Sequence, residues 1–119
     1  MIRPGVDLER VYVYRHAVDM RKAINGLVVL VESVLSMDPL SSSLFVFCNR
    51  KRDLVKMVWW ERNGFCLWMK KLEKERFKWP KHSDEQVITL DGQQLNWLLD
   101  GYDLSVMKPH RSLHYRSVL

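Results

Sequence analysis

Residues 44–72 read LFVFCNRKRDLVKMVWWERNGFCLWMKKL and decide the fold, because three apolar-aromatic stretches follow one another across two short polar links. The stretches cover residues 44–48, 54–60 and 65–72. Their β-branched and aromatic side chains are typical of strands, and links this short favour antiparallel neighbours. The second link ends in an Asn-Gly pair, which tolerates the positive φ of a tight hairpin. The segment therefore predicts an antiparallel β-meander.

A strand and a long helix are predicted upstream of the meander. Residues 11–14 read VYVY, which is typical of a strand. Asp19 is a candidate N-cap for a helix whose apolar residues recur every three or four positions, and Pro39 limits its end. Gly26 lies in the middle of this helix and costs on the order of 1 kcal/mol relative to alanine. We therefore expect another element to approach Gly26 closely.

A second helix is predicted downstream of the meander. Residues 73–80 combine helix-like charges with strand-like alternation, and residues 87–90 form a candidate short strand. Asp91 is a candidate cap for a helix that directs Leu95, Leu98 and Leu99 inward, with Gly101 suited to the position after its end. This order of elements predicts an α+β fold, a single domain over residues 1–103 with one mostly antiparallel sheet and helices packed on a face. We expect residues 104–119 to be a basic, mobile tail.

Composition excludes several classes of protein. The chain has 119 residues, of which 47% are hydrophobic and 28% charged, as expected for one globular domain. Its longest run without a polar residue, 27–31, is far shorter than the ~20 apolar residues of a membrane span. The N-terminus has no apolar stretch of the kind found in secretory signals. Cys48 and Cys66 fit reduced thiols, so a cytoplasmic protein is expected.

The candidate catalytic groups are scattered along the chain. The carboxylates considered for nuclease chemistry are Asp19, Asp53, Glu61, Glu73 and Asp91. No spacing among them forces two carboxylates onto one face, as two-metal phosphoryl chemistry requires. His110 and His114 lack a third metal ligand, and the glycines form no phosphate-binding loop. We therefore expect no catalytic residue, no metal site and no cofactor.

Basic and aromatic residues are interleaved in one part of the chain. The net charge is +5 and the isoelectric point is about 9.4, which favours polyanionic partners. Nine cations lie among the aromatic residues of this region: Arg50, Lys51, Arg52, Lys70, Lys71, Lys74, Arg76, Lys78 and Lys81. If one sheet face packs on the helices, Trp60 and Trp68 are candidates for a stacking platform on the other, as in single-strand-binding surfaces. The same composition also fits a second core face rimmed by solvated lysines, or a tryptophan-rich protein interface.

Two further cations, Arg21 and Lys22, fall in the first turn of the predicted long helix. Cations are disfavoured there by the positive end of the helix dipole. Free backbone amides together with two cations form an anion site, so this end is a candidate for a phosphate or a partner's carboxylate. The alternative is a solvated pair in which Asp19 balances the charge.

Several motifs recur in order between residue 11 and about residue 103. They are Asp19-Met20-Arg21-Lys22-x-x-x-Gly26-Leu27, Leu44-Phe45-Val46-Phe47-x-Asn49-Arg50, Lys56-x-x-x-Trp60, Gly64-Phe65-x-Leu67-x-x-Lys70-x-Leu72-Glu73, Phe77-x-Trp79-Pro80 and Leu98-Leu99-x-Gly101. Together they resemble the TnpB accessory proteins, the second open reading frame of insertion sequence sixty-six elements of bacteria. The resemblance implies a small protein encoded beside a separate DDE-type transposase and another accessory protein. It implies no catalytic residue, since strand transfer belongs to the transposase.

These observations predict a non-catalytic accessory protein for DNA transposition that contacts element-end DNA, the transposase, or both. The residues predicted to carry nucleic-acid contacts are Arg21, Lys22, Arg50, Lys51, Arg52, Trp60, Trp68, Lys70, Lys71, Arg76 and Lys78. The alternative is a protein-interaction subunit that docks a tryptophan-rich face on the transposase without binding DNA. It predicts salt-insensitive association, and an oligomer when the partner is missing. A small nuclease would instead cleave DNA with a metal and depend on Asp19.

Overall fold

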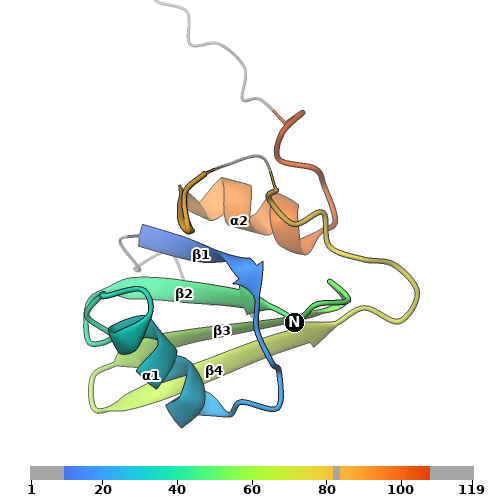
Figure 1. Ribbon diagram of the computed structural model, residues 1–119. Coiled ribbons are helices and arrows are strands. Elements are labelled where there is room, and N and C mark those ends of the chain that lie inside the picture. Colours follow the sequence, from blue (N-terminus) through green and yellow to red (C-terminus); the bar gives the residue numbers. More distant parts are fainter. Residues whose placement is uncertain (1–9, 82–83, 108–119) are drawn as a thin grey trace, which may run out of the picture.

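The computed structural model describes residues 10–81 and 84–107, which form a five-stranded sheet with one helix on each face (Figure 1). The strands are β1 (Arg10–Ala17), β2 (Ser43–Cys48), β3 (Leu54–Glu61), β4 (Gly64–Lys71) and β5 (Val87–Leu90), and the helices are α1 (Ile24–Ser33) and α2 (Gly92–Leu99). In space the strands follow the order β4-β3-β2-β1-β5. The α+β class predicted from the sequence is confirmed.

The predicted meander is present as β2, β3 and β4, with antiparallel pairing throughout. The β3–β4 hairpin closes at the pair Glu61↔Gly64, so its two turn residues are Arg62 and Asn63. The left-handed φ of this turn, 54°, belongs to Arg62. The hairpin was therefore predicted correctly, but its turn lies one residue before the Asn-Gly pair.

The sheet is mixed, which corrects the expected topology in part. β1 pairs with β2 in parallel, whereas β5 joins the outer edge of β1 in the antiparallel sense. The pair is parallel because the connection through α1 returns the chain to the end of the sheet at which β1 begins, so that β2 runs in the same direction as β1. The sheet is mostly antiparallel, as predicted, with this one parallel ladder at its centre.

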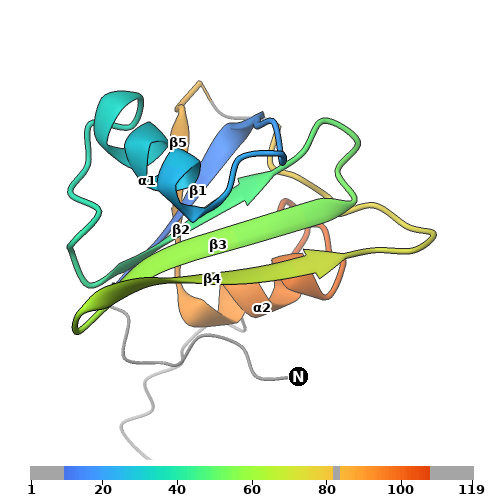
Figure 2. The same cartoon turned by 90° about the horizontal axis from the view of Figure 1, so that it is seen from below.

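The two helices cover opposite faces of the sheet, which overturns the expectation that they share one face (Figure 2). Leu27 and Val31 of α1 pack with Phe45 and Phe47 of β2. The side chains of α2 pack on the other face, against residues of β1, β2 and β3. Every residue of β2 is buried as a consequence. Because a helix covers each face, the side chains that point to either face of the central strands are mostly apolar.

Helix α1 is shorter than predicted at both ends. Its N-cap is Ala23, which makes no side-chain capping bond. The carboxylate of Asp19 instead accepts hydrogen bonds from the backbone N–H of Arg21, at 3.0 Å, and from its guanidinium. At the other end Ser36 adopts a φ of 54°, well before Pro39. A side-chain carbon on Gly26 would lie 3.2 Å from Cβ of Lys22, so the close approach expected at this glycine comes from the segment that precedes the helix.

Helix α2 matches its prediction in detail. Asp91 and Gln94 form a reciprocal capping box, in which the Asp91 carboxylate accepts from the Gln94 backbone N–H at 2.8 Å. Leu95, Leu98 and Leu99 are buried. Gly101 follows the helix with a φ of 96°, a conformation that glycine adopts without strain.

The segment after α2 returns to the core before the described chain ends. Leu104 is partly buried and packs against the cluster beneath α2. The rest of the predicted tail, from residue 108 to residue 119, lies outside the described residues. No helix in the described part of the chain is both long and apolar enough to cross a membrane.

Candidate nucleic-acid interface

A cleft of about 610 Å³ opens where four segments of the chain meet. These segments are the β2–β3 loop, the extended chain after β4, strand β5 with the start of α2, and the chain after α2. The lining residues are Arg50, Lys51, Arg52, Arg76, Phe77, Lys78, Trp79, Pro80, Lys81, Ile88, Thr89, Leu90, Gln94, Asp103, Leu104 and Ser105. The volume is typical of a small-ligand site.

The cleft is strongly basic. Six of its lining residues are cations and one, Asp103, is an acid. The five exposed cations are Arg50, Lys51, Arg76, Lys78 and Lys81. The side chains of these five make no hydrogen bond or ion pair with any other described residue. Their charge is therefore not neutralised within the described chain and is available to a polyanion.

The sixth cation, Arg52, is fixed inside the wall of the cleft. It adopts a φ of 61°, and its guanidinium donates to the backbone carbonyl of Arg15 at 3.3 Å. The same guanidinium lies over the ring of Trp79, with its central carbon 5.7 Å from the ring centroid. This distance is within the range of a cation–π interaction. Arg52 thus holds the loop in place as well as contributing charge.

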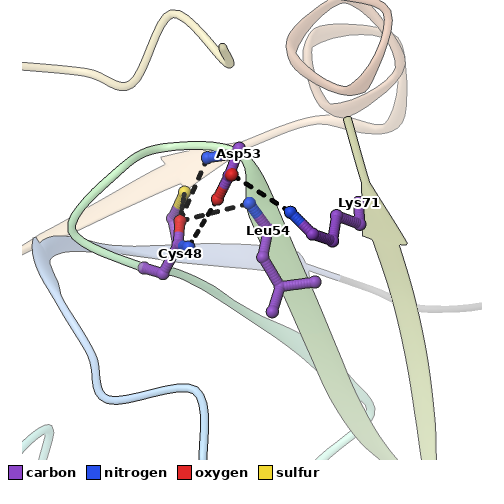
Figure 3. Close-up of polar contacts among 5 residues, drawn as sticks. Cys48, Asp53, Leu54 and Lys71 are labelled. Carbon is purple, nitrogen blue, oxygen red and sulfur yellow. Dashed lines mark hydrogen bonds and ion pairs between the residues drawn. The ribbon is translucent and has the colours of Figure 1, made fainter. Parts of the chain in front are cut away.

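Asn49 organises the basic β2–β3 loop. Its side-chain oxygen accepts from the backbone N–H of Asp53, at 3.0 Å, and of Leu54, at 3.1 Å, while its amide donates to the Asp53 carboxylate at 2.6 Å. Lys71 of β4 contacts the other Asp53 oxygen at 3.2 Å, as Figure 3 shows. These hydrogen bonds, first from Asn49 and then from Lys71, lower the pKa of Asp53. Asn49 therefore closes the loop that carries Arg50, Lys51 and Arg52.

The segment from Leu72 to Pro80 forms the second basic wall. Its backbone N–H groups at Leu72 and Phe77 donate to the carbonyls of Asp53 and Arg52, each at 2.7 Å. Phe77 and Trp79 are each only 3% exposed. Because the chain alternates, Arg76 and Lys78 face outward. The segment is neither helix nor strand, yet the alternation seen in its sequence is real.

Two predicted contact residues lie outside the cleft and have structural partners. Lys70 of β4 donates to the carbonyl of Leu99 at 3.0 Å, at the C-terminal end of α2, where a cation is favoured. Lys71 pairs with Asp53. Both lysines support the elements around the cleft and do not line it.

Trp60 and Trp68 do not form the joint platform that the sequence suggested. Trp68 pairs with Met57 and packs against the core beneath α2. Trp60 pairs with Phe65, at 5.0 Å between ring centroids, and lies three positions further along β3 than Met57. Successive side chains of a strand point to opposite faces, so the two tryptophans lie on opposite sides of the sheet.

Arg21 and Lys22 also lie away from the cleft. They precede α1, so the predicted anion site in its first turn is not formed. Arg21 pairs with Asp19, the alternative considered for this pair, and the resulting hydrogen bonds lower the pKa of Asp19 to about 2. The backbone carbonyls of Met20 and Lys22 accept hydrogen bonds from the buried ammonium of Lys56, at 2.8 and 3.0 Å.

The carboxylates and thiols of the described residues form no metal-binding cluster. No group of three His, Cys, Asp or Glu residues in residues 10–81 and 84–107 could hold a metal ion. His110 and His114 lie outside those ranges. Both cysteines are free, and burial raises the pKa of the Cys48 thiol to about 11. Burial, followed by the neighbouring Glu61 carboxylate, also raises the pKa of Cys66.

The sequence-based site prediction therefore grouped residues that the fold separates. Arg50, Lys51, Arg52, Arg76 and Lys78 do meet at one cleft, which also includes Lys81. The prediction missed Asn49, although an asparagine just before a short polar link is a known signal for a side-chain-closed turn. It also missed the positioning role of Trp79, which is revealed by contacts with the distant residues Tyr14 and Arg52.

Comparison with known proteins places this chain in a family. The family model described as "IS66 Orf2 like protein" matches residues 9–109. Uncharacterized protein y4hO of Sinorhizobium fredii is 37% identical over 94 residues, covering 79% of this chain and 81% of that protein. Uncharacterized protein y4jC of the same organism is 33% identical over 108 residues, covering 91% of each chain. No solved structure matches the chain. The chain therefore belongs to the IS66 Orf2-like family, as its resemblance to the TnpB proteins of insertion sequence sixty-six predicted.

Proposed function

We propose that this protein is a non-catalytic accessory factor in transposition of an IS66-type element, and that it binds element-end DNA through its basic cleft. Family membership supports the accessory role. The observation that carries DNA binding is the set of five exposed cations that meet at one cleft and have no ionic partner in the described chain. Cations in this state release counterions from DNA when they contact phosphates, which supplies affinity for any sequence.

The side chains of the cleft suit DNA binding without catalysis. The described chain brings no carboxylate pair or metal-binding cluster to the cleft, and Asp103 accepts hydrogen bonds from the backbone N–H and hydroxyl of Ser105. The cleft is built to hold a polyanion and not to cleave it. Strand transfer would then belong to the separate transposase that the family resemblance implies, while this protein acts on the DNA that the transposase processes.

The test is a titration of labelled element-end and scrambled duplexes with the full chain over a salt series. The cleft variant combines Lys51→Glu, Arg76→Glu and Lys78→Glu. The control variant has the same change in charge at exposed positions outside the cleft, Arg10→Glu, Arg62→Glu and Lys74→Glu. Lys74 is a close match, because it lies in the same segment as Arg76 and does not line the cleft.

We expect the cleft variant to bind at least about tenfold more weakly, and to lose close to 0.9 in salt slope for each phosphate contact removed. The control should bind within about threefold of the wild type. Equal losses in the two variants would mean that net charge, and not the cleft, determines affinity. Salt-insensitive binding to the transposase without DNA binding would instead support a protein-docking subunit.

A further inference from the structure

The interior of the cleft differs in chemistry from its rim. The exposed cations lie on the β2–β3 loop and on residues 76–81, whereas Ile88, Leu90 and Leu104 form apolar walls. A surface that contacts only the phosphates of a duplex needs cations and has no use for an apolar interior. An apolar interior below a cationic rim suits a ligand with an apolar, planar part and a charged backbone.

Polar side chains of α2 and of the chain after α2 can form hydrogen bonds with the edge of such a planar ligand. Gln94 lines the cleft, and its side-chain oxygen is held by the backbone N–H of Asp91 at 2.9 Å. That bond fixes the amide, and its Nε2 has no partner among the described residues. The Asp103 carboxylate and the Ser105 hydroxyl, on the chain after α2, also line the cleft and lie 2.7 Å apart. Amide and carboxylate groups can form hydrogen bonds with the edges of bases.

We propose that the cleft holds one unpaired nucleotide of DNA, with the base between the apolar walls and the flanking phosphates on the cationic rim. This inference rests on the proposed function and names its ligand, single-stranded or frayed DNA in place of intact duplex. The volume of about 610 Å³ fits one nucleotide-sized group. Phe77 and Trp79 are too buried for full stacking, so the base packs on aliphatic side chains and on the planes of the rim arginines.

The arrangement of cations on the rim favours a nucleic acid over an acidic protein segment as the ligand. The five exposed cations lie on two walls, and three of them, Arg76, Lys78 and Lys81, are spaced along one extended segment. Cations distributed along an extended segment can follow the phosphates of an extended polynucleotide, which carries a charge at every residue. An acidic peptide offers its charges on flexible side chains and has no planar group for the interior.

The experiment compares three labelled DNAs of one sequence at fixed ionic strength: a blunt duplex, the same duplex with a single-stranded overhang, and that overhang with one abasic nucleotide. The abasic probe keeps every phosphate and removes one base. We expect the overhang to bind at least about fivefold more tightly than the blunt duplex, and the abasic probe to lose most of this gain.

A variant that fills the cleft provides the matched protein-side test. Ser105→Phe fills the cleft and leaves all six cations in place, and Ser42→Phe adds the same ring at an exposed serine outside the cleft. Ser105→Phe should abolish the preference for the overhang and bind blunt duplex within about twofold of the wild type. Ser42→Phe should retain the preference.

The outcomes separate the two proposals. If no probe binds, the proposed function fails and this inference fails with it. If blunt duplex binds as tightly as the overhang, or Ser105→Phe leaves the preference intact, DNA binding stands and the unpaired nucleotide is excluded. If polyglutamate competes as well as an oligothymidylate of equal charge, the cleft recognises acidic segments, and the inference is overturned.

Discussion

The indole nitrogen of Trp79 donates a 3.0 Å hydrogen bond to the backbone carbonyl of Tyr14, joining residues 65 positions apart in the chain. Tyr14 lies in β1, next to the edge strand β5. The bond therefore ties the extended basic segment after β4 to the far half of the sheet. With Arg52 over the same ring, Trp79 connects both cationic walls of the cleft.

Replacing Trp79 with phenylalanine should test this connection. Trp79→Phe removes the donor and leaves the Tyr14 carbonyl without it, so we expect the free energy of unfolding in urea to fall by about 1–3 kcal/mol. Trp60→Phe is the control, because Trp60 is half-buried near the end of β3 and should lose less than about 1 kcal/mol. A smaller loss at Trp79 than at Trp60 would show that the segment does not depend on this bond.

Asn49 offers a way to change the cleft without changing its charge. Asn49→Ala removes the acceptor for two backbone N–H groups and the donor to Asp53, so we expect a loss of about 1–3 kcal/mol. DNA affinity should fall as well, because the loop cations lose their fixed positions. If Asn49→Ala binds DNA like the wild type, loop order does not contribute to binding.

The elements that could be predicted from sequence are those set by local signals. The meander, β5 and the Asp91 cap of α2 depend on neighbours within a few residues, and each was found. The parallel β1–β2 pair was missed, because it depends on how the chain returns across the sheet and not on either strand alone. The length of α1 was predicted wrongly, because the Asp19 carboxylate forms a local turn with Arg21 and does not cap the helix.

In the candidate site, too, local features could be predicted from the sequence and long-range contacts could not. Arg76 and Lys78 could be predicted to lie near aromatic residues because their positions alternate in one segment. The meeting of that segment with the β2–β3 loop depends on long-range bonds such as that from Phe77 to Arg52, for which the sequence carries no local signal. Trp60 and Trp68 were grouped by composition, and their pairing register separates them.

Lys56 is a buried cation whose removal should destabilise the protein. It is 9% exposed, and its ammonium donates to the carbonyls of Met20 and Lys22. Lys56→Met keeps the apolar stem and removes the donors, so we expect a loss of about 1–3 kcal/mol in urea unfolding. Lys22→Met, at an exposed side chain, should change stability by less than about 0.5 kcal/mol. Equal effects would mean that Lys56 does not hold the segment before α1.

The two cysteines should differ in reactivity toward a thiol reagent. Cys48 is fully buried and its pKa is raised to about 11, so it should react only when the protein unfolds. Cys66 is partly exposed at the edge strand β4, although burial and Glu61 raise its pKa. We expect one thiol to react slowly in the native protein and two in urea. The Cys66→Ser variant should show no native reaction, and a fast native reaction in that variant would contradict the burial of Cys48.

Acid should weaken the fold through two carboxylates whose pKa values are lowered. Arg21 holds the pKa of Asp19 at about 2, and Asn49 and Lys71 lower that of Asp53. A lowered folded pKa stabilises the native state fully above the unfolded value of about 3.9, and this contribution disappears as the pH falls through the folded value. Stability measured by urea unfolding should therefore fall below about pH 4, and less steeply in Asp19→Asn and Asp53→Asn. An unchanged slope in both variants would show that other groups carry the acid sensitivity.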